Sequence, residues 1–326
     1  MPRILHALSL LAAALLAAPH SAVAAGGVYP SGTVRIVVGF APGGSVDQMA
    51  RYFAMRLQES LGGSFIVINR TGASGNVAAG MVARSKPDGT TLLMTSVVHS
   101  INVSLFSNLP YDPSKDFSGI APIGYGPNAI AVNPSFPAKN LREFIAYAKA
   151  HPGQVAYADS GVGTMLNVGM ELFASEAGIK LLHVPYEGTG PAIQAVIAGQ
   201  VPVVSTGYGS VEQYAKSGKV RILGVATATR TSLAPGVPTF AEGANLPGFD
   251  ALSWIGLMAP AGTPKSVVDT LNAAIEKVER EPSFRSWEIS QGLVPYFLSP
   301  TAFDAQIKGD VVKWGNVVHR VGITRE

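Results

Sequence analysis

Short runs of β-branched and other apolar residues alternate along the chain with longer segments in which apolar residues recur every three or four positions. In the first long segment Met49, Phe53 and Leu57 are spaced four residues apart, which is typical of the buried face of a helix. A glycine-containing turn separates this segment from the preceding apolar run. The pattern then repeats, so we expect strands over residues 33–40, 65–69 and 91–95, and helices over residues 46–61 and 76–85.

A second set of alternating runs follows the Pro- and Gly-rich passage at residues 122–127, which we interpret as a crossover between two lobes. Alternating strands and helices predict right-handed βαβ units, so the expected class is α/β with mixed, mostly parallel sheets. From residue 264 onward the chain is expected to be helical apart from residues 294–297. Further strands are expected over residues 129–132, 155–158, 181–184, 201–205 and 222–226, and further helices over 140–150, 164–177, 190–198 and 210–217.

The N-terminus has the three parts of a secretory signal peptide. A short basic start at residues 1–3 precedes an apolar stretch at residues 4–18, and residues 22–24 read Ala-Val-Ala, as a cleavage site requires. The apolar stretch ends at Pro19, which leaves it too short for a membrane-spanning helix. We therefore expect residues 1–24 to be a cleaved signal peptide and the product to reside in the periplasm.

Charge and cysteine content exclude several classes of function. The chain of 326 residues has 24 Lys+Arg against 21 Asp+Glu, and these charges are scattered rather than gathered in a basic stripe, so we expect no nucleic-acid partner. The sequence contains no cysteine, which rules out disulfides, thiolate metal sites and thiol catalysis. We expect a monomer that holds no metal and no cofactor.

Sequence signatures of common enzymes are also missing. The sequence lacks a G-x-S-x-G nucleophile turn, a P-loop and an H-E-x-x-H pair. Four histidines follow the signal region, and we interpret each as structural because no two have the spacing of metal ligands: His99, His151, His183 and His319. An exported hydrolase or isomerase with Asp47 or His99 as acid/base stays an alternative. So does a receptor that signals to a membrane kinase.

Four glycine-containing turns lead into predicted helices, at residues 42–45, 71–75, 160–164 and 186–190. The first N–H groups of a helix have no partner within the helix, and the aligned peptide dipoles leave partial positive charge there. Glycine lets an anion approach this backbone closely, and in an open α/β sheet such turns gather at one edge. A single turn of this kind often serves only to cap its helix. Four together favour an anion site between two facing lobes.

Ordered motifs along the whole mature chain resemble one known family. Residues 37–47 read VVGFAPGGSVD, and residues 69–76 read NRTGASGN. The other motifs are LPYD at 109–112, KDF at 115–117, VPY at 184–186, VPTFAE at 237–242, and Trp254 ahead of APAGTP at 259–264. In this order they resemble the substrate-binding receptors of tripartite tricarboxylate transporters, known as the Bug or TctC type.

The resemblance implies a periplasmic binding-protein fold with a cleft between two α/β lobes. Lobe 1 would comprise residues 25–125 with 229–326, and lobe 2 residues 126–228. Such a receptor captures a small carboxylate by closing its lobes and delivers it to a two-component integral membrane permease, without catalysis. The resemblance leaves open whether the ligand is an organic acid, an amino acid or an aromatic carboxylate.

In this family backbone amides and hydroxyl groups of the first two loops, rather than an arginine, hold the ligand carboxylate. Asp47 could also meet a ligand amine or cap its helix. This chain has Thr164 and Asn167 where members commonly have Ser and His, and Glu187 where a basic residue is frequent, so its distal contacts would differ. The implied ligand-binding residues are Phe40, Pro42, Gly43, Gly44, Ser45, Asp47, Gly72, Ala73, Ser74, Gly75, Asn76, Ser96, Ser160, Gly161, Gly163, Thr164, Asn167, Tyr186 and Gly188.

Overall fold

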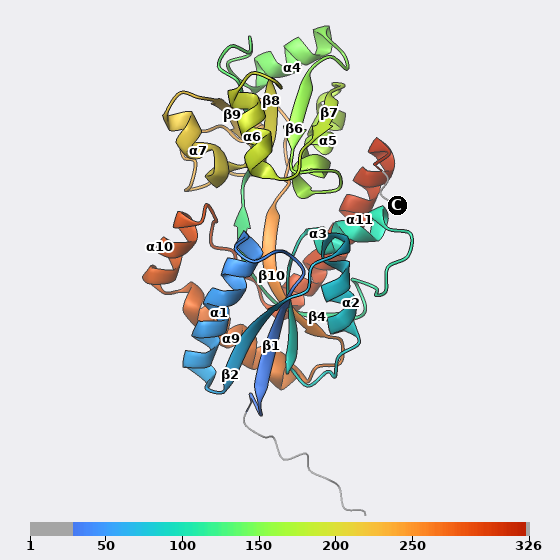
Figure 1. Ribbon diagram of the computed structural model, residues 1–326, viewed down its shortest axis with the longest axis vertical. Coiled ribbons are helices and arrows are strands. Elements are labelled where there is room, and N and C mark those ends of the chain that lie inside the picture. Colours follow the sequence, from blue (N-terminus) through green and yellow to red (C-terminus); the bar gives the residue numbers. More distant parts are fainter. Residues whose placement is uncertain (1–28, 324–326) are drawn as a thin grey trace, which may run out of the picture.

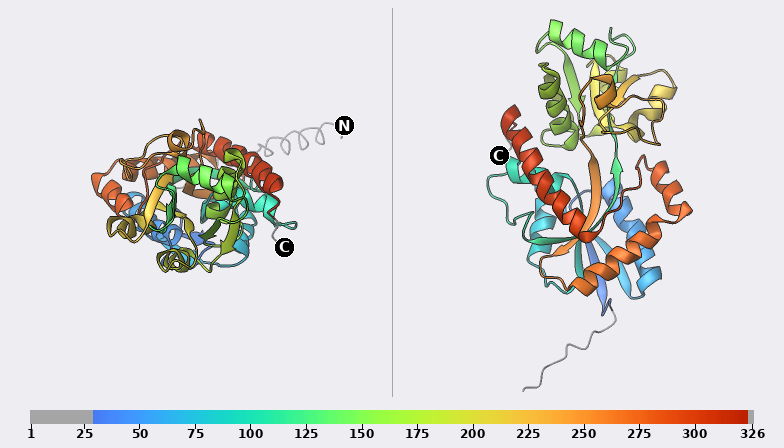
Figure 2. Two further views of the ribbon diagram at one scale, coloured as in Figure 1. Left: turned by 90° about the horizontal axis from the view of Figure 1, so that it is seen from above. Right: turned by 180° about the vertical axis from the view of Figure 1, so that it is seen from behind.

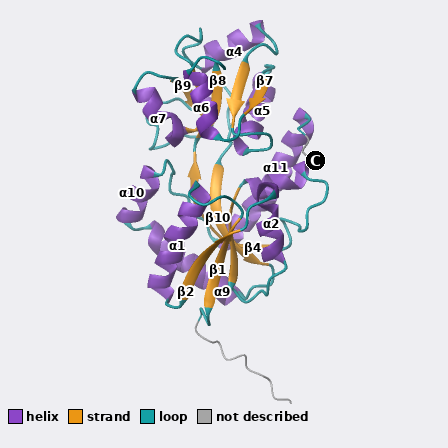
Figure 3. Cartoon of the chain, in the orientation of Figure 1, coloured by secondary structure: helices purple, strands orange, loops and turns teal. Residues whose placement is uncertain are grey.

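The structure is a computed structural model that describes residues 29–323. The signal peptide predicted for residues 1–24 lies outside the described residues. The described chain forms two five-stranded sheets, each flanked by helices, which follow one another along the long axis of the molecule (Figure 1). Figure 3 shows strands and helices intermixed in both parts. The predicted α/β class is therefore confirmed.

The first sheet has the strand order β2-β1-β3-β10-β4. Strand β1 pairs in parallel with β2 and β3, whereas β10 is antiparallel to both β3 and β4. Side chains of β1 alternate between the two faces of the sheet, so that Ile36 and Val37 pack in different hydrophobic clusters. The strands are β1 (Thr33–Val38), β2 (Ser64–Asn69), β3 (Thr91–Ser96), β4 (Phe117–Gly126) and β10 (Ser253–Pro260).

The second sheet repeats this arrangement with the strand order β7-β6-β8-β5-β9. Strand β6 is parallel to β7 and β8, and β5 is antiparallel to β8 and β9. In each sheet as described, the fourth strand in order runs against the others, which accords with the expected mixed, mostly parallel sheets. The strands are β5 (Asn128–Val132), β6 (Ala156–Asp159), β7 (Leu182–Pro185), β8 (Val203–Gly207) and β9 (Arg221–Val225).

Helices cover both faces of each sheet. Helices α1, α9 and α10 pack on one face of the first sheet, and α2, α3 and α11 on the other. None of the helices within residues 29–323 has the length and apolar content needed to cross a membrane. The helices are α1 (Ser45–Leu61), α2 (Asn76–Ala83), α3 (Val98–Leu105), α4 (Leu141–Ala150), α5 (Met165–Ala177), α6 (Thr189–Ile197), α7 (Tyr208–Lys216), α8 (Phe240–Gly243), α9 (Lys265–Glu279), α10 (Pro282–Ser290) and α11 (Pro300–Val321).

The chain passes from the first sheet to the second between β4 and β5, and it returns at β10. The segment before β10 stays with the second sheet, because Phe240 of α8 and Phe249 pack against Phe173 of α5. We therefore propose residues 29–126 with 253–323 as lobe 1 and residues 127–252 as lobe 2. This division places the return later than the residue 229 expected from the sequence.

Strands β4 and β10 and helix α3 were not expected from the sequence. Strand β4 contains Pro122 together with Gly119, Gly124 and Gly126, a composition that is typical of a loop. Because β4 is an edge strand of its sheet, Pro122 is tolerated there, and the pairing of β4 with β10 shifts register beside it. The Pro- and Gly-rich passage thus forms the end of a strand that leads into the second sheet.

One hydrophobic cluster extends from lobe 1 into lobe 2 along α11. It includes Leu105 of α3, Trp314 and Val318 of α11, and Phe173 of α5. Seen from behind in Figure 2, α11 runs diagonally across lobe 1 toward lobe 2. This side of the molecule joins the two lobes by apolar packing.

Candidate ligand-binding site

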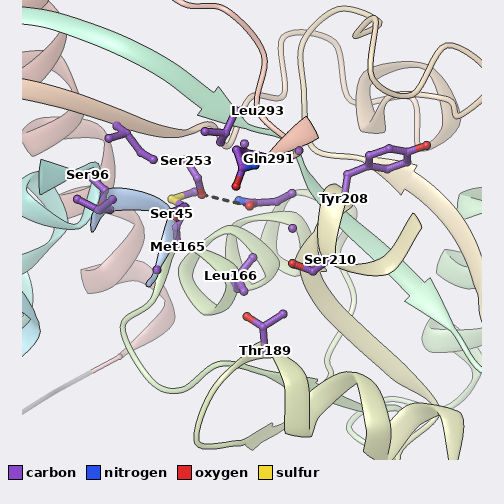
Figure 4. A pocket seen from close by; sticks show the side chains of 18 of the residues that line it. Ser45, Ser96, Met165, Leu166, Thr189, Tyr208, Ser210, Ser253, Gln291 and Leu293 are labelled. Carbon is purple, nitrogen blue, oxygen red and sulfur yellow. Dashed lines mark hydrogen bonds between the residues drawn. The ribbon is translucent and has the colours of Figure 1, made fainter. Parts of the chain in front are cut away.

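A cavity of about 690 Å³ lies between the two lobes. From lobe 1 its wall includes the end of β3 and the loop between β1 and α1, residues 39–44, which we call the first loop. From lobe 2 it includes the starts of α5, α6 and α7. Asn128 and Ser253, which begin β5 and β10, also line it and are hydrogen-bonded to each other at 3.1 Å. Figure 4 shows side chains from both lobes around this space. A small molecule bound here would contact both lobes at once.

The first residues of five helices line this cavity. They are Ser45 of α1, Val98 of α3, Met165 of α5, Thr189 of α6 and Tyr208 of α7. A helix start exposes amide N–H groups without partners in the helix, and its dipole adds partial positive charge. Five such ends around one cavity favour the binding of a negatively charged group there.

Four of these helix starts, those of α1, α3, α6 and α7, have no side-chain cap. The N-cap residues of α1, α6 and α7 are Gly44, Gly188 and Gly207, which carry no side chain to accept from the first amides. Among the described residues that line the cavity, Glu212 is the only charged one, and Lys216 pairs with it at 2.9 Å. An anion bound here would therefore meet main-chain amides and neutral side chains rather than lysine or arginine.

Neutral polar and apolar side chains share the rest of the wall. The mixture suits a small molecule that has one anionic group on a partly apolar body. The polar side chains belong to Ser45, Ser96, Asn128, Thr189, Tyr208, Ser210, Gln213, Ser253, Ser290 and Gln291, and the apolar ones to Phe40, Val46, Val97, Val98, Met165, Leu166, Leu233, Ile255, Ile289 and Leu293.

The buried side chain of Asp47 is hydrogen-bonded to the backbone of the first loop. Its carboxylate is 1% exposed and accepts hydrogen bonds from the Gly43 amide at 2.8 Å, from Arg51 at 2.9 Å and from Asn69 at 2.8 Å. Burial alone would raise the pKa of Asp47, but these hydrogen bonds outweigh it and lower the pKa to about 2. The carboxylate thus fixes Gly43, the residue before the N-cap of α1, without capping the first amides of the helix, and contact of Asp47 with a ligand amine stays a prediction.

The second glycine loop, residues 72–75, packs directly behind the first. A Cβ on Gly39 would lie 2.6 Å from the Cα of Gly75, so the two backbones touch. Ala73 and Ser74 have φ values of 45° and 55°, a left-handed conformation that is strained for both residues. The side-chain amide of Asn102 donates to the Ser74 backbone carbonyl at 3.0 Å and to the side-chain oxygen of Asn76 at 2.7 Å. Residues 72–76 do not line the cavity in this structure.

In lobe 2 the predicted polar side chains stabilise the loop before α5. The Thr164 hydroxyl donates to the Gly161 carbonyl at 2.8 Å and accepts from the Asn167 amide at 3.3 Å, which caps the helix. Asn167 is 1% exposed, accepts from the Gly163 amide at 3.1 Å and donates to the Tyr157 hydroxyl at 2.9 Å. Both side chains therefore position α5, whose first residue lines the cavity.

The structure brings four of the predicted ligand-binding residues to the cavity wall: Phe40, Gly44, Ser45 and Ser96. The remaining predicted residues lie in or beside the loops around it without lining it, and their contact with a ligand stays a prediction for a differently closed state: Pro42, Gly43, Asp47, Gly72, Ala73, Ser74, Gly75, Asn76, Ser160, Gly161, Gly163, Thr164, Asn167, Tyr186 and Gly188. Sequence reasoning missed the start of α7, Ser253 of β10 and the segment with Gln291. Gly207, the glycine directly before α7, is the sequence feature that could have indicated the start of α7 as part of the site.

Neither Asp47 nor His99, the two residues considered for acid/base chemistry, lines the cavity. His99 is 2% exposed, its ring stacks on Tyr111 with centroids 5.1 Å apart, and burial lowers its pKa to about 3. His151 contacts the Tyr147 carbonyl at 2.9 Å, and His183 faces Asp159 at 2.9 Å. Within the described residues no cluster of His, Asp and Glu has the geometry of a metal site.

Two buried glutamates lie in the helices that precede the segment with Gln291, Glu279 at the end of α9 and Glu288 within α10. Glu279 is 5% and Glu288 is 0% exposed, and Glu288 lies directly against Gly124 of β4, where a Cβ would collide with its carboxylate. Burial raises the pKa of Glu288 to about 8. Burial and the neighbouring charge of Glu288 raise the pKa of Glu279 to about 9, while Arg285 lowers both pKa values. Burial therefore favours the protonated form of both carboxyl groups in the folded protein.

Since these folded pKa values exceed the ordinary value of 4.5, the stabilisation from the two protonated glutamates is complete below about pH 4.5, and we expect it to be lost as pH rises toward about 8 to 9. Glu288→Gln, which mimics the protonated form, should raise the free energy of unfolding by about 2 kcal/mol at about pH 8 and leave it nearly unchanged at about pH 5. Urea unfolding at both pH values measures this, with the exposed Glu276→Gln on α9 as control. If Glu288→Gln and Glu276→Gln changed the free energy of unfolding equally at both pH values, the raised pKa of Glu288 would be contradicted.

The fold and the cavity define a class, that of two-lobed α/β binding proteins with a ligand cleft between the lobes. Residues 49–323 match the family described as the tripartite tricarboxylate transporter family receptor. The chain is 33% identical over 325 residues to the protein BugT of Bordetella pertussis, which covers 99% of this chain and 98% of BugT. The chain belongs to this family, the TctC or Bug type of solute-binding receptor.

Solved structures agree with this assignment. The structure of Rpa4515 from R. palustris with adipate is similar to this chain with a TM-score of 0.78 and 31% identity, and the match covers 91% of this chain and 100% of that one. The structure of MatC from Rhodopseudomonas palustris with bound malate has a TM-score of 0.74 and 33% identity, covering 89% of this chain and 100% of that one. The structure of the periplasmic binding protein BugD has a TM-score of 0.74 and 31% identity, covering 91% of this chain and 100% of that one.

Proposed function

We propose that this protein is a periplasmic receptor that captures a small carboxylate between its lobes and delivers it to a two-component membrane permease. The observation that carries the proposal is the convergence of five helix starts on one cavity whose lining contains no lysine or arginine among the described residues. A carboxylate is the anion that such a set of neutral donors suits. Adipate and malate in the relatives' structures support this class of ligand.

The energetics require only a few contacts. A hydrogen bond to a charged group contributes roughly 1.5–3 kcal/mol net, and micromolar affinity corresponds to about 8 kcal/mol. Donors from both lobes complete the set when the lobes close, which couples binding to closure. The closed surface is then what the permease recognises. The ligand is delivered unchanged, because the carboxylate of Asp47 is held by the first loop and the buried His99 does not line the cavity.

A thermal-shift screen tests the proposal. Organic acids, amino acids and aromatic carboxylates are each compared with the matched amide, for example adipate with adipamide. We expect at least one acid to raise the melting temperature, because a ligand present at about 100 times its Kd stabilises the fold by about 2.7 kcal/mol, while its amide has no effect. Equal stabilisation by acid and amide, or stabilisation by none of the acids, would contradict the proposal.

A further inference from the structure

The segment that follows α10 is fastened to lobe 1. The Leu293 amide donates to the Glu288 carbonyl at 3.0 Å, and Gly292 has a φ of 72°, so α10 ends in a glycine-dependent turn. Val294 then exchanges two backbone hydrogen bonds with Tyr125 of β4, at 3.0 and 2.9 Å. The segment therefore moves with the strand that leads out of lobe 1.

The start of α7 is fastened beside the same strand from the other lobe. The Tyr208 amide donates to the carbonyl of Pro127, the residue between β4 and β5, at 2.8 Å. Gly209, the next residue of α7, then faces Gly292. Two segments from different lobes thus meet next to the point where the chain crosses between them.

The two glycines meet backbone to backbone. A Cβ on Gly209 would lie 2.7 Å from the Cα of Gly292, and a Cβ on Gly292 would lie 2.8 Å from the Cα of Gly209. Side chains essentially never approach a backbone this closely, so neither position accepts even alanine without a shift. Both glycines line the cavity, and Gln291 beside Gly292 is among the side chains that surround it in Figure 4.

We propose that Gly209 and Gly292 are positioning residues whose contact sets how far the lobes close. The opposite side of the molecule is joined by the hydrophobic cluster along α11, whereas here the lobes touch through two bare backbones. A methyl group between the glycines holds the lobes apart next to the crossing strand, and a small separation there becomes larger across the cleft. The contact also places Gln291 against the ligand, so it acts on affinity through position and not through direct bonding.

Gly209→Ala tests the proposal without reference to any ligand. Gly209 is a helical residue with no positive φ, so alanine there is favourable for α7 and the fold is retained. The sequence has no cysteine, so Lys86→Cys in lobe 1 and Lys219→Cys in lobe 2, both exposed, carry spin labels without background. Double electron–electron resonance on the ligand-free protein should show a longer distance between the labels in Gly209→Ala. Gly309→Ala on α11, where a Cβ meets nothing within 4 Å, should leave it unchanged.

Affinity supplies the second measurement. For any acid that the wild type binds, the Kd should rise about tenfold in Gly209→Ala, because the closed state is then populated about a tenth as often. The melting temperature should not fall. An unchanged label distance in Gly209→Ala would overturn the proposal whatever the ligand is. Failure of every acid to bind the wild type would count against the proposed function alone, since the distance measurement needs no ligand.

Discussion

Gly44→Leu is expected to abolish ligand binding while leaving the protein folded. Gly44 lines the cavity at the start of α1, and its backbone, with φ −74° and ψ 166°, suits any residue. A Cβ there lies 3.6 Å from the Ala41 carbonyl, so the fold has room for a side chain, which then occupies the space of the anion. Loss of two hydrogen bonds to a carboxylate corresponds to a Kd raised by at least about 100-fold.

Calorimetric titration with an acid that binds the wild type measures this effect, and urea unfolding verifies that the fold persists. Gly32→Leu is the matched control, because Gly32 is exposed just before β1 and a Cβ there meets nothing within 4 Å. We expect the control to bind like the wild type. If Gly44→Leu bound the acid with wild-type affinity, the first loop would not be part of the binding site.

Asp47→Ala is expected to lower the free energy of unfolding by about 3 kcal/mol, because it removes a buried carboxylate that accepts hydrogen bonds from Arg51 and from the side-chain amide of Asn69. The Gly43 amide also loses its acceptor, so the first loop loosens and binding weakens as well. Since the folded pKa of Asp47 is about 2, below the ordinary value of 3.8, its contribution is present above that value and is lost as pH falls toward 2.

Denaturant unfolding at neutral pH and at lower pH measures both the loss of stability in Asp47→Ala and its dependence on pH. The control is Asp269→Ala, which removes a helix carboxylate paired with Lys265 at the surface, and surface pairs of this kind contribute about 0–1 kcal/mol. The acid dependence of stability should weaken in Asp47→Ala and persist in Asp269→Ala. A similar small effect of both substitutions would show that the loop does not depend on Asp47.

Local pattern predicted much of this fold because each predicted strand or helix carries its own signal. Helix α1 follows from the four-residue spacing of Met49, Phe53 and Leu57, all of which are buried. Strands β4 and β10 could not be predicted in the same way. The glycines and Pro122 of β4 are compatible with a strand only because β4 lies at a sheet edge, which is a property of the tertiary structure.

The site was predicted where a glycine turn directly begins a helix, as at Gly44 and Ser45. It was missed where segments distant in sequence come together, as with Gln291 and the start of α7. Side-chain direction was also beyond the sequence, since Asn76 and Asn167 face into their own lobes. The structure further shows that Gly75 has a φ of 90°, so a bulky residue there strains the backbone and tests the fold as much as the site.

A crystal structure with a bound acid tests most directly how this receptor holds an anion. We predict carboxylate oxygens within hydrogen-bonding distance of main-chain amides at the start of α1 and of at least one helix of lobe 2, with Gly209 and Gly292 in contact. A carboxylate paired instead with a lysine or arginine, or a ligand bound outside the interlobe cavity, would contradict the account.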